Sequence, residues 1–181
     1  VFGKDIPTAS SSIDIRGIAS LTFYGTSDNA RAGAHVAGLG DLDGDGDNEV
    51  IIGAINQDDG GEDAGKVYLY EGPVTGNIID EDADATLIGD TEDANAGASL
   101  AGIADIDGDG LDDFIVGAPG ATNGSVTGAG TAYIITGALS GSSSLSDATA
   151  SISGTETDSA AGDSVSGLGY IDGDGVADIL V

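Results

Sequence analysis

Three stretches of this chain share one spacing of acidic residues and glycines, and they decide its fold. They read Asp41-Leu-Asp-Gly-Asp-Gly-Asp-Asn-Glu49, Asp105-Ile-Asp-Gly-Asp-Gly-Leu-Asp-Asp113 and Tyr170-Ile-Asp-Gly-Asp-Gly-Val-Ala-Asp178. The common Asp-Gly-Asp-Gly string begins at positions 43, 107 and 172, so it recurs after 64 and then 65 residues. A period of this length that is kept twice indicates a tandem repeat.

The sequence on either side of each stretch keeps the same register. A run rich in Gly and Ala precedes each one, and an apolar run follows it. We therefore treat residues 1–181 as one repeat region with two complete units and a half-unit at each end. The boundaries are half-blade 1–32, blade repeat 33–96, blade repeat 97–161 and half-blade 162–181.

Each unit contains four short apolar runs bounded by Gly, Asp, Asn or Ser, a pattern that favours strands over helices. The first strands are expected at 33–40, 97–104 and 162–169, the second at 49–54, 113–118 and 178–181, the third at 66–70 and 131–135 with a remnant at 1–2, and the fourth at 19–24, 85–88 and 150–152. Four strands per long repeat predict an all-β fold made of β-propeller blades. We expect the glycine-rich first strand at the inner position, where blades converge.

The composition limits the function. The 181 residues carry 32 acidic side chains against four basic ones, a formal charge of −28. Such a chain repels nucleic acid and anionic lipid, which excludes both as partners. There is no Cys, which removes disulfides, thiol catalysis and Cys-based metal sites, and no apolar run is long enough to insert in a membrane.

The acidic stretches themselves predict calcium sites. Ca²⁺ takes six to eight oxygen ligands, mostly carboxylates and backbone carbonyls, and a short loop supplies them when alternate residues point inward. Counting the first residue as position 1, the stretches offer acids at positions 1, 3, 5 and 9 and a carbonyl at position 7. A Gly follows position 5 each time, where we expect a positive φ. An EF-hand would need an acid at position 12, where the first two stretches have Ile52 and Val116.

We expect up to three Ca²⁺ ions, one in each stretch. The predicted ligands are Asp41, Asp43, Asp45, Asp47 through its carbonyl, and Glu49 in the first stretch; Asp105, Asp107, Asp109, Leu111 through its carbonyl, and Asp113 in the second; and Asp172, Asp174, Val176 through its carbonyl, and Asp178 in the third. Tyr170 replaces the first acid of the third stretch, so we expect this site to bind most weakly. The alternative is that Asp-Gly-Asp-Gly is only a polar turn, but without a cation the crowded carboxylates would repel one another.

These motifs resemble the FG-GAP repeat family, which forms the blades of integrin α-subunit propellers and occurs in many bacterial surface proteins. The Asp-rich loop and Gly117-Ala118-Pro119 match the family pattern, and Gly53-Ala54-Ile55 matches with Ile for Pro. The family's Phe-Gly appears here as Ala32-Gly33, Ala96-Gly97 and Ala161-Gly162. The resemblance implies a seven-bladed propeller with its calcium loops on one face. Three blade-equivalents do not close a ring, so we expect a partial propeller or part of a larger assembly.

We therefore expect this chain to function by binding and not by catalysis. No Ser–His or Cys–His arrangement is evident, so we predict that the chain is not an enzyme but an extracellular or cell-surface module with a structural or adhesive role. The alternatives are a non-catalytic propeller carried by a secreted polysaccharide-active enzyme and a subunit of a self-assembling extracellular filament. The loops at 55–65 and 119–130 are the expected surfaces for a protein or carbohydrate ligand.

Both ends of the chain fall within expected strands. The half-blade at 162–181 lacks two outer strands, and the stretch at 1–24 supplies a pair of that kind. Because open strand edges invite pairing, we expect the ends to pair with other repeats of the same chain or with neighbouring copies.

Overall fold

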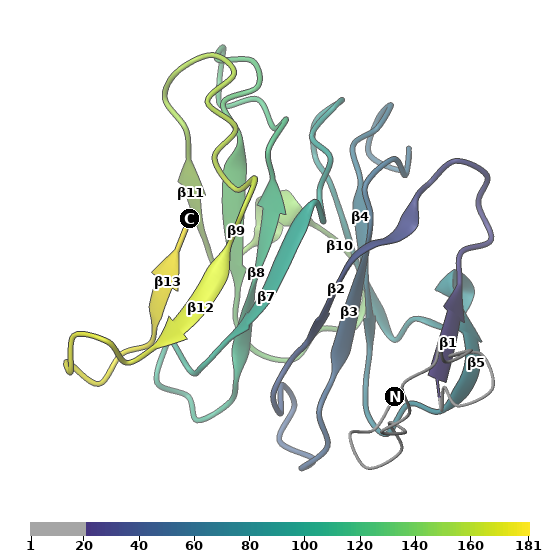
Figure 1. Ribbon diagram of the computed structural model, residues 1–181, viewed down its shortest axis with the longest axis vertical. Coiled ribbons are helices and arrows are strands. Elements are labelled where there is room, and N and C mark those ends of the chain that lie inside the picture. The colour runs from purple at the N-terminus through teal and green to yellow at the C-terminus, as the bar shows by residue number, and fades with distance from the viewer. Residues whose placement is uncertain (1–20) are drawn as a thin grey trace, which may run out of the picture.

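The computed structural model describes residues 21–181, and the strand expected at 1–2 lies outside the described residues. Thirteen strands and two single-turn 3-10 helices make up this part, so the all-β prediction is confirmed. Figure 1 shows the strands as a fan of twisted sheets, with β1 and β5 at one end of the row and β12 and β13 at the other. No helix among residues 21–181 is long and apolar enough to cross a membrane.

The first complete repeat forms a blade of four antiparallel strands. Its strands, in order from the inner edge outward, are β2 (Ala32–Gly38), β3 (Val50–Ala54), β4 (Lys66–Tyr70) and β6 (Ala85–Ile88). The strands β3 and β4 are almost wholly buried, and their runs of Val, Ile, Leu and Tyr suit a sheet that is covered on both faces.

The second repeat builds the same blade. Its strands are β7 (Ser99–Ile103), β8 (Asp113–Ala118), β9 (Thr131–Ile135) and β11 (Ala150–Ser153), hydrogen-bonded in that order. The third contributes only β12 (Ser166–Gly169) and β13 (Asp178–Leu180), an antiparallel pair. At the other end β1 (Leu21–Tyr24) falls where a fourth strand was expected.

The glycine-rich first strands do lie where the blades converge. The strand β7 packs between β2 and β12, and the contacts are made backbone to backbone. A Cβ atom on Gly167 would lie 2.5 Å from the carbonyl oxygen of Gly102, and one on Gly102 would lie 3.1 Å from that of Gly38. Larger residues at these positions would push neighbouring blades apart, which explains the glycines.

The structure also contains two strands that the sequence pattern did not predict. They are β5 (Gly76–Ile79) and β10 (Gly141–Ser144), and each precedes a 3-10 helix, at Asp80–Asp82 and Leu145–Asp147. Each lies between the third and fourth strands of its own repeat but pairs with the fourth strand of the repeat before it. They were missed because neither Gly-Asn-Ile-Ile nor Gly-Ser-Ser-Ser alternates apolar and polar residues.

The core is continuous across the repeats. One cluster of buried side chains joins residues of both complete blades, among them Leu69, Leu87, Phe114 and Tyr133. A blade thus does not bury its apolar faces alone but against its neighbours, as expected for a stack of repeats. This shared core fixes the spacing of the loops that connect first and second strands.

Candidate metal centres

The three Asp-rich stretches connect the first strand of each repeat to the second. They follow β2, β7 and β12 and precede β3, β8 and β13. Figure 1 shows these three connections at the same end of the fan, opposite the loops at 55–65 and 119–130. Because the sheets place equivalent loops side by side, any metal bound by them would lie on a single face of the molecule.

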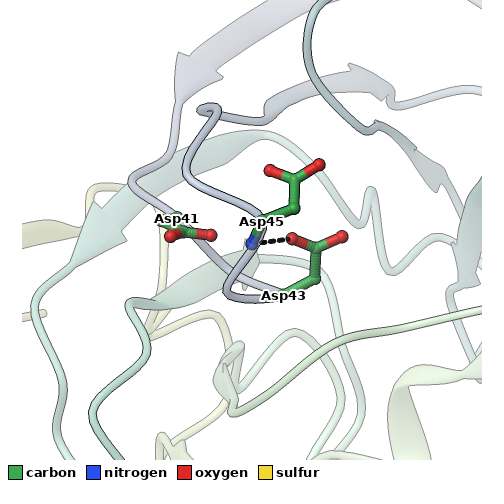
Figure 2. Close-up of side chains that lie close together, drawn as sticks. All are labelled: Asp41, Asp43 and Asp45. Atoms are coloured by element: carbon green, nitrogen blue, oxygen red, sulfur yellow. Dashed lines mark hydrogen bonds between the residues drawn. The ribbon is translucent and has the colours of Figure 1, made fainter.

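The first loop brings together three of its predicted ligands. Carboxylate oxygens of Asp41, Asp43 and Asp45 all lie within 4.8 Å of one another. Figure 2 shows these side chains on a tight turn, with the Asp45 amide donating to Asp43 Oδ1 at 3.0 Å. Within residues 21–181 these three carboxylates have no basic partner, since the single salt bridge there joins Lys66 to Asp59.

Backbone amides hold these carboxylates in place. The Gly44 amide donates to Asp41 Oδ1 at 2.7 Å and the Gly46 amide donates to Asp41 Oδ2 at 3.1 Å. The Asp47 amide donates to Asp45 Oδ1 at 2.8 Å. Such bonds place the aspartate oxygens on the inside of the turn, and they favour the ionised carboxylates.

The second loop repeats this geometry bond for bond. Asp105, Asp107 and Asp109 form the same cluster within 4.8 Å. The Gly108 and Gly110 amides donate to the two oxygens of Asp105 at 2.6 and 2.8 Å. The amides of Asp109 and Leu111 donate to Asp107 and Asp109 at 3.1 and 2.8 Å. The arrangement is therefore a property of the repeat and not of one loop.

Glycines make the turn possible at two positions in each loop. The residue after position 5 has a positive φ, as predicted: 94° at Gly46, 94° at Gly110 and 88° at Gly175. The residue after position 3 also has a positive φ, at Gly44, Gly108 and Gly173, which the sequence analysis did not predict. Because side chains with a Cβ rarely adopt this conformation, both glycines of Asp-Gly-Asp-Gly are needed for the backbone path.

The acid at position 9 is buried at the base of each complete loop. Glu49 is 1% exposed, and its Oε2 accepts a hydrogen bond from the Leu42 amide at 2.6 Å. Asp113 is 0% exposed and accepts from the Ile106 amide at 2.8 Å and from the Gly137 amide at 3.3 Å. In both loops the position-9 carboxylate therefore links the backbone amide of position 2 to the start of the second strand. The sequence pattern did not predict this role.

One oxygen of Glu49 is left without a partner. Its Oε1 is buried and accepts no hydrogen bond, although an unpaired buried carboxylate oxygen is costly. Burial raises the pKa of Glu49, and the neighbouring charges of Asp43 and Asp41 raise it further. The Leu42 amide lowers this pKa in part. The nearby Gly72 amide also lowers it, although it does not hydrogen-bond Oε1.

Asp113 has the same electrostatic setting. Burial raises its pKa, the Ile106 and Gly137 amides lower it, and the charges of Asp107 and Asp109 raise it again. The acids of one loop thus repel one another, and a cation among them would relieve this repulsion. The donor set fits a hard cation: every candidate ligand is an oxygen, and neither Cys nor His takes part.

The third loop is incomplete. Tyr170 is 53% exposed, and it offers no carboxylate where the other loops have Asp41 and Asp105. The remaining bonds are kept: the Asp174 amide donates to Asp172 at 2.9 Å, the Val176 amide to Asp174 at 2.8 Å, and the Ile171 amide to Asp178 at 2.8 Å.

A direct contact joins the first two loops. The Asp112 amide donates to the Asp41 carbonyl at 3.1 Å, and Leu111 lies against Gly44, where an added Cβ would be 3.4 Å from its Cδ2. The position of one candidate site therefore depends on the backbone of the next.

Comparison with known proteins identifies the repeat. A family model of the FG-GAP repeat matches residues 32–70 and 96–135, which are the two complete first-to-third strand segments with their Asp-rich loops. The chain contains two FG-GAP repeats.

Integrin alpha chains are among the relatives of these FG-GAP repeats. Integrin alpha-V of Gallus gallus is 40% identical over 94 residues, which cover 50% of this chain and 9% of the relative. Integrin alpha-5 of Xenopus laevis is 37% identical over 105 residues, which cover 55% of this chain and 10% of the relative. The chain thus spans about a tenth of the length of the curated relatives it matches.

The structure places the predicted ligands of the FG-GAP loops in two groups. The acids at positions 1, 3 and 5 converge in both complete loops, while Glu49 and Asp113 lie behind them against position 2. The third loop retains Asp172, Asp174 and Asp178 in matching roles. The carbonyl ligands expected at Asp47, Leu111 and Val176 stay predictions, as does the assignment of all these residues as metal ligands.

Proposed function

We propose that this chain is a calcium-binding propeller-repeat module with a structural and adhesive role in an extracellular or cell-surface protein. The observation that carries the proposal is the pair of matching triads, Asp41, Asp43, Asp45 and Asp105, Asp107, Asp109, each formed by carboxylates without a basic partner in the described part of the chain. The FG-GAP repeats and the integrin alpha relatives support the propeller and the extracellular setting.

Calcium fits these loops better than other metals. The oxygen-only donor set disfavours zinc and copper, which select nitrogen and sulfur. Mg²⁺ demands a small octahedral site, whereas Ca²⁺ accepts six to eight oxygens in irregular geometry. The three carboxylates, a carbonyl at position 7 and Oε1 of Glu49 or the carboxylate of Asp113 would supply much of such a shell, with water completing it.

Bound calcium would act on the fold and not on a reaction. Each loop joins an inner strand to the strand beside it, so a cation there would stiffen the face on which blades meet. Calcium modules of extracellular proteins bind at roughly 10⁻⁴–10⁻³ M, a range in which the sites would fill outside the cell. We propose no catalytic role for the acids, because their spacing is accounted for by metal binding.

An adhesive role needs a surface for a ligand, and a polar groove recurs in both repeats. In the second repeat a cavity of about 360 Å³ is lined by Asp90, Asn123, Tyr133 and Ser151 among others, and the Tyr133 hydroxyl donates to Asp90 at 3.1 Å. In the first repeat a cavity of about 380 Å³ is lined by equivalent positions that include Gln57 and Tyr68. The cavity of the first repeat reaches the loop at 55–65 through Gln57, and that of the second repeat reaches the loop at 119–130 through Asn123, which supports these loops as the ligand-facing surface.

Calorimetric titration tests the calcium proposal directly. Adding Ca²⁺ to the metal-free chain should show two stronger sites and one weaker site. Asp105→Asn combined with Asp107→Asn should abolish one of the stronger sites, while the exposed pair Asp58→Asn and Asp59→Asn, equal in charge removed, should leave all three. Absence of saturable binding at millimolar Ca²⁺, or equal losses in both variants, would contradict the proposal.

A further inference from the structure

The polar groove of the second repeat has a floor of paired residues on two strands. On β9 and β11, Tyr133 stands opposite Ser151 and Thr131 opposite Ser153, and all four line the groove. Residues two apart on a strand face the same side of the sheet, so these side chains form one polar surface. The hydroxyl oxygens of Thr131 and Ser153 lie 2.9 Å apart, within hydrogen-bond distance.

The facing wall of this groove comes from the first repeat. Asp90 follows the last strand of the first blade, and its Oδ1 accepts a hydrogen bond from the Tyr133 hydroxyl at 3.1 Å across the boundary between the repeats. Asn123, in the loop at 119–130, and the 3-10 helix at Leu145–Asp147 enclose the groove further. The groove is therefore built by two repeats packed together.

A groove of similar volume lies at the equivalent place in the first repeat, about 380 Å³ against about 360 Å³. There the outer edge of β6 is hydrogen-bonded to β10, so such a groove does not require a free strand edge. Equivalent residues of the two grooves lie 65 positions apart, since β4 begins at Lys66 and β9 at Thr131. The two grooves can therefore be compared residue by residue.

The two grooves differ in charge at three equivalent positions. The first groove carries Lys66, Asp80 and Glu81, and the second carries Thr131, Leu145 and Ser146 in their places. The charges of the first groove already have partners, since Lys66 Nζ lies 2.7 Å from Asp59 and Asp80 accepts from the Thr26 amide. Among the described residues that line the second groove, Asp90 alone is charged.

Three polar side chains of the second groove keep unused hydrogen-bonding capacity within residues 21–181. Asp90 uses Oδ1 for the Tyr133 hydroxyl, which leaves its Oδ2 to accept. Asn123 donates through Nδ2 to the Gly154 carbonyl at 3.0 Å, which leaves its Oδ1 to accept. Ser151 is exposed, and its hydroxyl can both donate and accept. The groove thus offers two acceptor oxygens and one hydroxyl to a ligand.

These groups suit a ligand that is rich in hydroxyls. Carboxylate and amide oxygens accept from O–H groups, and a serine hydroxyl bonds with either partner. A peptide is usually held by an apolar or aromatic anchor in a pocket. The large apolar residues here, Tyr133 and Leu145, are 7% and 0% exposed, so they are covered and offer no such anchor. A saccharide presents hydroxyl groups around its ring and can meet the free polar groups directly.

Charge and volume narrow the class of saccharide. The chain has a formal charge of −28, and no basic side chain among the described residues lines the groove, so a sulfated or carboxylated sugar would be repelled. The cavity of about 360 Å³ is at the small end of the range for ligand sites, roughly 300–1,000 Å³. It suits the terminal sugar of a glycan better than an extended polymer.

We propose that the groove between the two complete blades binds a terminal neutral sugar of a glycan. Asp90 Oδ2 and Asn123 Oδ1 accept hydrogen bonds from its hydroxyl groups, and the Ser151 hydroxyl bonds to a third. The proposal rests on the adhesive role proposed above and gives that role a class of ligand, but it does not rest on calcium binding.

A glycan array probed with the full chain tests the class of ligand. The chain is clustered on beads so that weak contacts add, and the array carries neutral oligosaccharides beside sialylated and sulfated forms of the same structures. We expect retention on neutral glycans that share one terminal sugar and no retention on their anionic forms. Saturation-transfer NMR with the methyl glycoside of that sugar then measures the affinity.

Substitutions locate the site. Asp90→Asn keeps an acceptor for Tyr133 but loses the charged oxygen, so affinity for the methyl glycoside should fall roughly tenfold. Ser151→Ala should lower it by about two- to fivefold. Glu92→Gln is the matched control, because this exposed residue lies in the same loop as Asp90 and carries the same charge but does not line the groove. It should bind as the wild type does, and thermal unfolding checks that each variant is folded.

Equal losses in Asp90→Asn and Glu92→Gln would overturn the proposed site. Retention on sialylated or sulfated glycans alone would overturn the proposed ligand. Adhesion to a glycan-free protein surface, with no retention on the array, would also overturn it and leave the adhesive role standing. The calcium titration described above is independent: glycan binding by a chain without saturable calcium binding would support the groove and contradict the calcium sites.

Discussion

The second and third Asp loops follow almost the same backbone path but differ in their first acid. In the second loop the Asp105 carboxylate accepts hydrogen bonds from the Gly108 and Gly110 amides. In the third loop Tyr170 stands in its place, yet Gly173 and Gly175 keep φ of 81° and 88°, close to the 86° and 94° of their counterparts. The position-1 aspartate is therefore not needed to shape the loop.

This comparison assigns different tasks to the acids of one loop. Those at positions 3, 5 and 9 make the same amide hydrogen bonds in both loops and belong to the folded turn. The acid at position 1 adds a carboxylate to a cluster that already repels itself. An acid that adds repulsion and is not required for the turn supports the proposal that a cation binds there.

If the proposed sites bind calcium, its removal should have the largest effect on stability, and it should affect the second loop far more than the third. Each site stabilises the fold by about 2.7 kcal/mol when free calcium is a hundredfold above the dissociation constant. Two complete sites should then raise the melting temperature by roughly 10–20 °C for a chain of this size. Differential scanning calorimetry in calcium and in chelator measures this. Superimposable transitions in calcium and in chelator would contradict the proposal that calcium stabilises the complete loops.

Single substitutions should separate the two loops by a smaller amount. In calcium, Asp107→Ala should destabilise the fold by about 2–3 kcal/mol, because it removes one ligand of a complete site. Asp172→Ala, at the same position of the incomplete loop, should cost less than about 1 kcal/mol. Urea unfolding with and without chelator gives both values. In chelator the two variants should have nearly equal free energies of unfolding. A difference that persists in chelator would show that the turn itself, and not bound calcium, causes it.

Restoring the missing acid should have the smallest effect on stability but the clearest effect on binding. Tyr170→Asp gives the third loop an acid at every position of the pattern, and added ligand charge tightens calcium sites. We expect roughly a tenfold gain in affinity for that site, which corresponds to about 1.4 kcal/mol. Titration calorimetry measures it, and Tyr170→Asn, similar in size but uncharged, is the matched control. Equal affinities in both variants would show that position 1 contributes no charge to binding.

The repeat and its main strands could be predicted because each depends on local pattern. The four expected strands of each complete repeat are present within a few residues of their predicted bounds, since runs such as Val67 to Tyr70 and Phe114 to Val116 favour sheet wherever they occur. The first strands begin later than predicted in the second and third repeats, at Ser99 and Ser166. Gly33, Gly97 and Gly162 all have φ of 85–86°, and only in the first repeat does the strand continue across this point, through an irregularity between Ala32 and His35.

The candidate sites were predictable in their residues but not in their arrangement. Spacing alone identified the acids, because alternate residues of a tight turn face the same side. It did not reveal that Glu49 and Asp113 would be buried and bonded to the position-2 amides. The amides of Gly72 and Gly137, two residues beyond the ends of the third strands, lie against these carboxylates, so their surroundings come from residues far along the chain.

The sequence by itself determined the features that depend on neighbouring residues: the repeat period, the β character, the Asp-Gly-Asp-Gly turns and the acids that line them. Only the tertiary structure decided which repeat the strands β5 and β10 each pair with. Gly141 to Ser144 have little intrinsic preference for sheet, and they become a strand because the edge of β6 offers unpaired backbone groups. Pairing of this kind is set by where an open edge lies in space, and that position depends on how the preceding blade packs against the next.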